Sequence, residues 1–340
     1  MNPIPTEPSA VYAPPPTGYS PPVVPKSTAI FQQIRAAVGQ VFVGQEEVLS
    51  QVLAALLAGG HVLLEGKPGL GKTHLVLALA HTFGGSFRRI QFTPDLMPSD
   101  VCGHTLFDMQ SGTFRVRRGP VFANLLLADE INRAPAKTQS ALLEVMQEAQ
   151  VTIDGESHTL APPFMTFATQ NPIEQEGTYP LPEAQLDRFL LKVLIDYPDA
   201  LNETWVVKAV SSRASGGGLS TSSVQQVCGP EDIIAAQEEA AAVQAVEQVV
   251  DYAVNIVRAT RQHSAISLGA GTRGAISLVR TAKAYALLEG RMYITPADVK
   301  RAVLPVLRHR VQLAPEIAIS GQGVDDMLLS LLKTVEAPRV

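Results

Sequence analysis

Residues 66–73 combine the residue types that point most directly to chemistry. They read Gly-Lys-Pro-Gly-Leu-Gly-Lys-Thr and fit the pattern G-x-x-x-x-G-K-[ST]. Glycines let the backbone approach an anion closely, and the N–H groups that begin a following helix attract phosphate. Lys72 would reach the β- and γ-phosphates, and the Thr73 hydroxyl would ligate Mg²⁺. We therefore expect nucleotide contacts from Gly66, Lys67, Pro68, Gly69, Leu70, Gly71, Lys72, Thr73 and His74.

The flanking residues supply the context that such a loop needs. Residues 61–65 form a short apolar run with the length of a buried strand. Residues 75–80 are rich in Ala and Leu, as in a buried helix. A Gly-rich turn that fits the pattern by chance is the alternative, and the order of strand, loop and helix argues against it.

Two carboxylates end a second apolar run. Residues 125–128 are Leu-Leu-Leu-Ala, and Asp129 and Glu130 follow them directly. After a phosphate-binding loop, Asp129 can hold Mg²⁺ through its water shell, and Glu130 can act as the base that polarises an attacking water. Acids at a strand end are otherwise ordinary turn residues, so this interpretation depends on the loop at 66–73.

Three further polar residues are candidates, each with a structural alternative. Asn171 follows the apolar run 164–169 and can orient a lytic water, although Asn before Pro also starts turns. Arg188 lies in an apolar setting, where an arginine more often makes a structural salt bridge. Arg273 begins a predicted helix, where a surface arginine is equally ordinary.

The elements expected to position these residues alternate along the chain. Short apolar runs predict strands at 61–65, 89–92, 125–129, 164–169 and 193–197, separated by helical patterns such as 136–149. This order predicts an α/β fold with a parallel sheet flanked by helices. Weak alternation predicts β-hairpins over 104–118 and 150–160.

The remainder of the chain is expected to be helical. Helical patterns cover 230–242, 243–264, 271–289, 295–310 and 322–335, and a Ser/Gly-rich segment at 211–223 predicts a mobile loop before them. The sequence thus predicts a Pro-rich disordered tail at 1–27, an α/β domain at 28–198 and a small all-helical lid at 199–340.

Composition narrows the class of protein. The chain has 340 residues, 46% of them hydrophobic, and a net charge of −5, so it has no general attraction to nucleic acid or anionic lipid. It has 2 cysteines, too few for a disulfide framework, which favours a reducing compartment. With neither a secretory signal nor an apolar run of membrane-spanning length, we expect a cytoplasmic location.

The order of these elements resembles that of AAA+ ATPases. The residues of several stretches resemble those of the MoxR family, in the branch with an insert in helix 2. The stretches that carry the resemblance are 91–100 (Gln-Phe-Thr-Pro-Asp-Leu-Met-Pro-Ser-Asp), 127–134 (Leu-Ala-Asp-Glu-Ile-Asn-Arg-Ala), 168–172 (Ala-Thr-Gln-Asn-Pro) and 174–189. The match covers about residues 30–335.

The resemblance implies a role for each matching position. Gly44 and Gln45 would lie near the adenine, and Asn171 would be sensor 1. Arg188 would be the arginine finger supplied to the neighbouring subunit, and Arg273 would be sensor 2, also acting across the boundary. The hairpins at 104–118 and 150–160 would face the pore or the client.

The resemblance further implies ATP and Mg²⁺ as cofactors, a hexameric ring, a von Willebrand factor A (vWA) domain partner and chaperone-like remodelling of a client. Such remodelling includes maturation of an enzyme or insertion of a metal or cofactor. Three alternatives remain open: a chelatase-type motor subunit, a nucleotide-switched binding module with little turnover, and a DNA-acting AAA+ protein. The acidic charge balance argues against the last.

Overall fold

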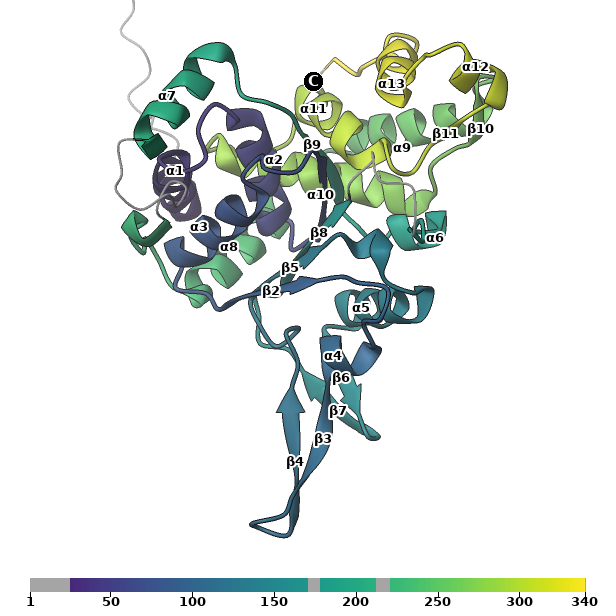
Figure 1. Cartoon of the computed structure of the whole chain (residues 1–340). Helices are drawn as coiled ribbons and strands as arrows, with labels where there is room; N and C mark the ends of the chain where they lie inside the picture. The colour runs from purple at the N-terminus through teal and green to yellow at the C-terminus, as the bar shows by residue number, and fades with distance from the viewer. Residues whose placement is uncertain (1–24, 171–177, 212–220, 340) are drawn as a thin grey trace, which may run out of the picture.

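The computed structural model describes residues 25–170, 178–211 and 221–339 (Figure 1). Its centre is a parallel sheet of 5 strands in the order β2-β5-β8-β1-β9. The strands are β1 (Val62–Gly66), β2 (Phe87–Gln91), β5 (Leu125–Asp129), β8 (Met165–Gln170) and β9 (Leu191–Ile195). Because parallel strands end at the same edge of a sheet, the loop after β1 and the polar ends of β5 and β8 meet there.

The central strands are apolar on both sides because helices cover both faces of the sheet. In β5, Leu125 and Leu127 belong to one buried core, and Leu126 and Ala128 belong to the other. The first core includes the helices α1 (Lys26–Gly39), α2 (Glu46–Leu57) and α3 (Lys72–Thr82), and the second includes α5 (Ala136–Glu148). The predicted α/β class is confirmed, and continuous apolar runs are the expected signature of such strands.

Strand β2 differs from the others because it lies at the edge of the sheet. Four of its five residues are at least partly exposed, and only Ile90 is buried. Arg89 and Gln91 therefore share the side opposite to Ile90, next to the end of β5. This polar edge strand therefore places Arg89 and Gln91 close to Asp129 at the end of β5.

Two hairpins project from the sheet domain. The longer one pairs β3 (Gly103–Asp108) with β4 (Thr113–Arg118), and the shorter one pairs β6 (Gln150–Ile153) with β7 (Glu156–Thr159). Both match the hairpins expected from the sequence. The short helix α4 (Pro98–Cys102) connects β2 to β3, and Figure 1 shows β3 and β4 extending well away from the body of the molecule.

The C-terminal region is a helical lid. Its helices are α7 (Ala200–Ser211), α8 (Pro230–Ala242), α9 (Glu247–Gln262), α10 (Thr272–Leu288), α11 (Pro296–Leu307), α12 (Pro315–Ile319) and α13 (Val324–Leu332). The core that contains α1 to α3 continues into α8, α9, α10 and α11, so sheet domain and lid share buried apolar contacts. Within the described residues, no helix is both long and apolar enough to cross a bilayer.

Several boundaries differ from those expected. Helix α1 begins at Lys26, inside the stretch assigned to the tail; residues 1–24 and 212–220 lie outside the described residues. Helix α9 begins at Glu247 instead of residue 243, because Gln244 pairs with Tyr293 and Ile294 in an extended conformation. The lid also contains α7, α12 and a small antiparallel pair, β10 (Ile266–Leu268) with β11 (Gln312–Leu313), which the sequence did not predict.

Candidate nucleotide-binding site

The loop between β1 and α3 has the geometry of a phosphate cradle. Gly71 caps α3 with φ 79°, a left-handed conformation that favours glycine. Lys72 is the first residue of α3, and its Nζ donates a 2.5 Å hydrogen bond to the Gly66 carbonyl oxygen at the start of the loop. Burial lowers the pKa of Lys72, and the nearby carboxylates of Asp129 and Glu130 act in the opposite direction. The hydrogen bond to Gly66 thus holds the Lys72 amine at the start of the phosphate loop.

Asp129 ends β5, and both its carboxylate oxygens accept hydrogen bonds. Thr169 Oγ1 donates to Oδ1 at 2.5 Å. Arg89 donates to Oδ2 from Nη2 at 2.5 Å and from Nε at 3.2 Å. The aspartate side chain is 18% exposed. The carboxylate is therefore fixed in orientation from two neighbouring strands, β8 and β2.

Glu130 adopts a left-handed backbone conformation with φ 55°. Its N–H donates to Thr169 Oγ1 at 2.8 Å. Its Oε2 accepts from Gln91 Nε2 at 2.7 Å and from Arg133 Nη1 at 3.0 Å. A non-glycine residue held at positive φ at this position is typical of a functional constraint.

Sequence reasoning missed four residues of this network: Thr169, Arg89, Gln91 and Arg133. The available signal was the alternation of side chains along β2. Positions 89 and 91 lie on the same side of that strand, and position 91 pairs with Asp129 at the end of β5. Asn171, the predicted sensor, lies outside the described residues. Thr169, two residues before it, is the β8 residue that contacts both acids.

A largely apolar pocket of about 360 Å³ lies beside the phosphate loop. It is lined by the connection between α1 and α2, by the loop and His74, and by α7, including Phe42, Gln45, Leu70, Tyr197, Val206 and Val210. Gly44 has φ 75°, and a Cβ there would come within 2.7 Å of the Asn202 side chain. Of the two predicted base-binding residues, Gln45 lines this pocket and Gly44 lies against α7, which adds a wall that the sequence did not indicate. Apolar walls of this kind suit a flat heterocycle.

Replacing Val206 by Asp is expected to weaken ADP binding by about tenfold or more, because a carboxylate would then face an apolar base. Leu201→Asp is the matched control, since Leu201 is also on α7 but is 85% exposed and does not line the pocket. Affinity can be followed through Trp205, the one tryptophan of the sequence, which lies on the same helix. Equal affinities of the two variants would remove α7 from the binding site.

Arg188 lies at the other end of the sheet from the phosphate loop. It precedes β9, whose first residues pair with His61 before β1, whereas the loop follows the end of β1. Five residues of strand separate the two ends by about 16 Å. The backbone N–H of Arg188 bonds the Gln185 carbonyl oxygen at 3.2 Å, but its side chain makes no hydrogen bond or ion pair with any of the described residues. The guanidinium is therefore available to bind a further group.

Arg273 is at the same end as Arg188. Its Nη1 lies 3.5 Å from Asp187 Oδ2, and both arginines line one depression with Arg280. The structure thus brings together the two arginines that were expected to act across a subunit boundary. It separates both from the phosphate loop of their own chain.

Arg310 fixes the turn that carries Arg188. Its Nε donates to Asp187 Oδ1 at 2.7 Å, and its Nη2 donates to the Phe189 carbonyl oxygen at 2.6 Å. The Arg310 side chain is only 2% exposed. Burial lowers the pKa of the adjacent His309 well below its usual value, and that ring bonds the same Phe189 oxygen at 3.0 Å.

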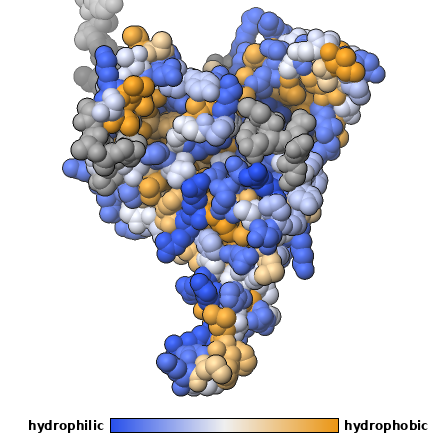
Figure 2. Space-filling model, in the orientation of Figure 1, coloured by the Kyte–Doolittle hydropathy of each residue, from blue (hydrophilic) through white to orange (hydrophobic). Residues whose placement is uncertain are grey.

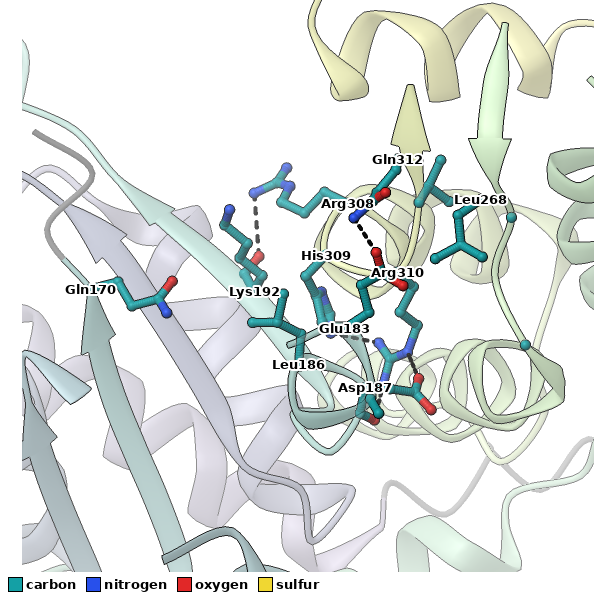
Figure 3. Close-up of a pocket in the computed structure, with 14 residues that line it drawn as sticks. Gln170, Glu183, Leu186, Asp187, Lys192, Leu268, Arg308, His309, Arg310 and Gln312 are labelled. Carbon is teal, nitrogen blue, oxygen red and sulfur yellow. Dashed lines mark hydrogen bonds and ion pairs between the residues drawn. The ribbon is translucent and has the colours of Figure 1, made fainter. Parts of the chain in front are cut away.

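Figure 3 shows Asp187, His309 and Arg310 at the seam between sheet and lid, around a cavity of about 320 Å³. Arg308 reaches the Lys192 carbonyl oxygen at 3.3 Å and, within the lid, Asp325 Oδ2 at 2.8 Å. With the bonds of His309 and Arg310, residues 308–310 join lid and sheet at several points. We expected helix over 295–310, but α11 ends at Leu307, just before these three residues. The cavity lies where the lid contacts the sheet domain, and the polar groups that line it already pair with each other.

Comparisons with known proteins agree with this arrangement. The model of the family described as "ATPase family associated with various cellular activities (AAA)" matches residues 61–191, and the model of the AAA lid domain matches residues 258–328. The chain is 42% identical over 312 residues to chaperone MoxR1 of Mycobacterium tuberculosis, covering 89% of this chain and 81% of the relative. The chain belongs to the MoxR family of AAA ATPases. The resemblance inferred from the sequence is confirmed.

Two further relatives support the same family. The MoxR-family chain is 46% identical over 301 residues to the uncharacterized protein YeaC of Bacillus subtilis, covering 88% and 92% of the two chains. It resembles the crystal structure of a candidate ATPase from Cytophaga hutchinsonii with a TM-score of 0.84 and 41% identity, covering 92% and 96%. An AAA ATPase binds ATP, so the apolar pocket and the phosphate loop together form a site of the right kind.

The donor set also fits the Mg²⁺ that MoxR-family ATPases would use with ATP. No group of three or more His, Cys, Asp and Glu side chains within the described residues could hold a metal by itself. Mg²⁺ in nucleotide sites takes only one or two protein oxygens and completes its shell with phosphates and water. Thr73 and Asp129 supply oxygens of that kind at the carboxyl edge of the sheet.

Proposed function

We propose that this MoxR-family ATPase hydrolyses Mg²⁺-bound ATP in a hexameric ring and uses the energy to remodel a client protein in the cytoplasm. The client would be matured or loaded with a metal or cofactor, together with a vWA-domain partner. One observation carries the proposal. The strand whose Gln91 bonds the candidate base Glu130 leads directly, through α4, into the projecting β3–β4 hairpin.

The hairpin has the surface that a client-binding element needs. Phe107 and Phe114 face each other across the strands with ring centroids 5.1 Å apart, yet they are 54% and 73% exposed. Met109 near the tip is 89% exposed. Figure 2 shows this apolar group at the far end of the molecule, beside hydrophilic surface. Exposed apolar patches bordered by polar residues commonly mark interaction sites.

The chemistry would follow from the site described above. Lys72 and the loop N–H groups would hold the phosphates, and Thr73 and Asp129 would hold Mg²⁺, which neutralises phosphate charge. Glu130 would accept a proton from a water that attacks the γ-phosphorus, while the bond to the bridging oxygen of the β-phosphate breaks. Asn171 would position that water. Such phosphoryl transfer relies on positioning and charge stabilisation more than on covalent chemistry.

The ring is supported by the separation of parts within one chain. Arg188 and Arg273 lie at the opposite end of the sheet from the loop that would bind ATP. Both would therefore act on a nucleotide held by the next subunit. Each site would then be built from two copies of the chain.

The test compares client-stimulated ATP hydrolysis with basal hydrolysis. Reduced, carboxymethylated α-lactalbumin serves as a permanently unfolded client. The double variant Phe107→Ser/Phe114→Ser is expected to need about 30-fold more client for the same stimulation, because truncated aromatic anchors typically cost about 2 kcal/mol or more. Basal hydrolysis should stay unchanged, since the hairpin is remote from the nucleotide site.

Ile319→Ser is the matched control, because Ile319 is 86% exposed but lies on α12 in the lid. Client stimulation that survives in the hairpin variant would contradict client binding there. Nucleotide binding without any turnover in the wild-type chain would favour the nucleotide-switched binding module instead.

A further inference from the structure

Strand β2 places an arginine on the candidate metal ligand. Arg89 donates twice to Asp129 Oδ2, at 2.5 and 3.2 Å, while Thr169 bonds the other oxygen, Oδ1. The contact follows from the pairing of the edge strand. Gln91 is in register with Asp129, and Arg89 faces the same side two residues earlier. Nothing in the family resemblance assigned Arg89 a role.

This ion pair and a bound Mg²⁺ make opposite demands on the same carboxylate. A metal with its water shell needs the free lone pairs and the negative charge of Asp129. The guanidinium occupies Oδ2 with two N–H groups and neutralises the charge. Another cation close to a divalent metal also costs electrostatic energy. Mg²⁺ can therefore bind at Asp129 at full strength only after Arg89 has moved.

The surroundings allow Arg89 to move. Its side chain is 48% exposed, so it can swing into solvent without leaving a buried cation unpaired. Its Nη2 also donates to Gln91 Oε1 at 3.3 Å, and Gln91 Nε2 bonds Glu130. The four side chains thus form one connected line from the metal ligand to the candidate base.

We propose that Arg89 is a built-in competitor of Mg²⁺ at Asp129, which the metal displaces when it binds with nucleotide. The arrangement raises the Mg²⁺ concentration that the site requires, and it couples metal entry to the partners of Glu130. The inference rests on the proposed function, because it takes Asp129 as the metal ligand. A purely supporting salt bridge makes the opposite prediction, since its loss would disorder Asp129 and weaken metal binding.

The experiment is a calorimetric titration of Mg²⁺ into the full chain saturated with ADP, which needs no turnover. Arg89→Met is expected to tighten Mg²⁺ binding by between about twofold and about fivefold, the range expected for an exposed ion pair. Arg89→Gln should act in the same direction and serves if the first variant folds poorly. Arg88→Met is the matched control. Arg88 is the neighbouring exposed arginine, and within the described residues its side chain bonds only the Phe87 carbonyl oxygen, so its loss should leave Mg²⁺ affinity unchanged.

The double variant Arg89→Met/Asp129→Asn separates competition from a general charge effect. If Arg89 acts by occupying Asp129, its removal should have no further effect once the carboxylate is gone. Tightening that persists in the Asp129→Asn background would overturn the inference, as would unchanged or weaker binding in both Arg89 variants. If Asp129→Asn alone leaves Mg²⁺ affinity unchanged, Asp129 is not a metal ligand, and this result contradicts both the proposed metal site and the inference.

Discussion

Arg188→Ala is expected to reduce ATP turnover by about 10³-fold or more while leaving ADP affinity within about twofold, because an arginine supplied from outside stabilises only the transition state. The structure gives two reasons. Arg188 is about 16 Å of strand away from its own phosphate loop. Its side chain also has no hydrogen bond or ion pair with the described residues, so its removal leaves no partner unsatisfied and should not destabilise the fold.

Subunit mixing is the decisive measurement. Arg188→Ala chains and Lys72→Ala chains should each be inactive alone, for different reasons. A mixture contains seams at which an intact loop from one chain meets an intact Arg188 from the other, so activity should partly return. Arg35→Ala, on an exposed face of α1, is the control and should be fully active. Full activity of pure Arg188→Ala, or no recovery on mixing, would contradict a role across the boundary.

Glu130→Gln is expected to slow hydrolysis by about 10²- to 10⁴-fold and to leave the chain loaded with intact ATP, because the amide cannot accept the proton of the attacking water. The replacement keeps the shape of the side chain and one oxygen that can accept from Gln91 or Arg133. Binding should therefore survive.

Single-turnover assays with labelled ATP, followed by analysis of the bound nucleotide, measure this effect directly. Glu148→Gln changes an exposed glutamate at the end of α5, far from the loop, and should hydrolyse ATP at the wild-type rate. Rapid turnover by Glu130→Gln would assign the base role to another group, and ADP as the only retained nucleotide would do the same.

Much of the fold was predictable because its signals are local. The three inner strands, β1, β5 and β8, are largely apolar runs, since helices cover both faces of the sheet. The phosphate loop has a fixed spacing that glycine conformation explains. The two hairpins were visible as weak alternation around turn residues. In each case neighbouring residues determine the element, and no long-range pairing has to be known.

The parts that the sequence did not reveal depend on contacts distant along the chain. Arg89 is ordinary surface charge until β2 is placed beside β5, 40 residues away. Arg310 is the last residue of a predicted helix in the sequence, and only the fold brings it to Asp187, 123 residues earlier. Helix α7 was missed because its apolar residues, such as Leu201, Trp205 and Val206, are spread around the helix and form no single apolar stripe. The limits expected for the tail, the sheet domain and the lid stay predictions.

The seam made by Arg310 has a mechanical consequence for a ring. The lid holds Asp187 and Phe189 on either side of Arg188, so any tilt of the lid must carry that guanidinium along. In the proposed ring, a change in the lid position of one subunit would therefore move Arg188 toward or away from the nucleotide of the next subunit.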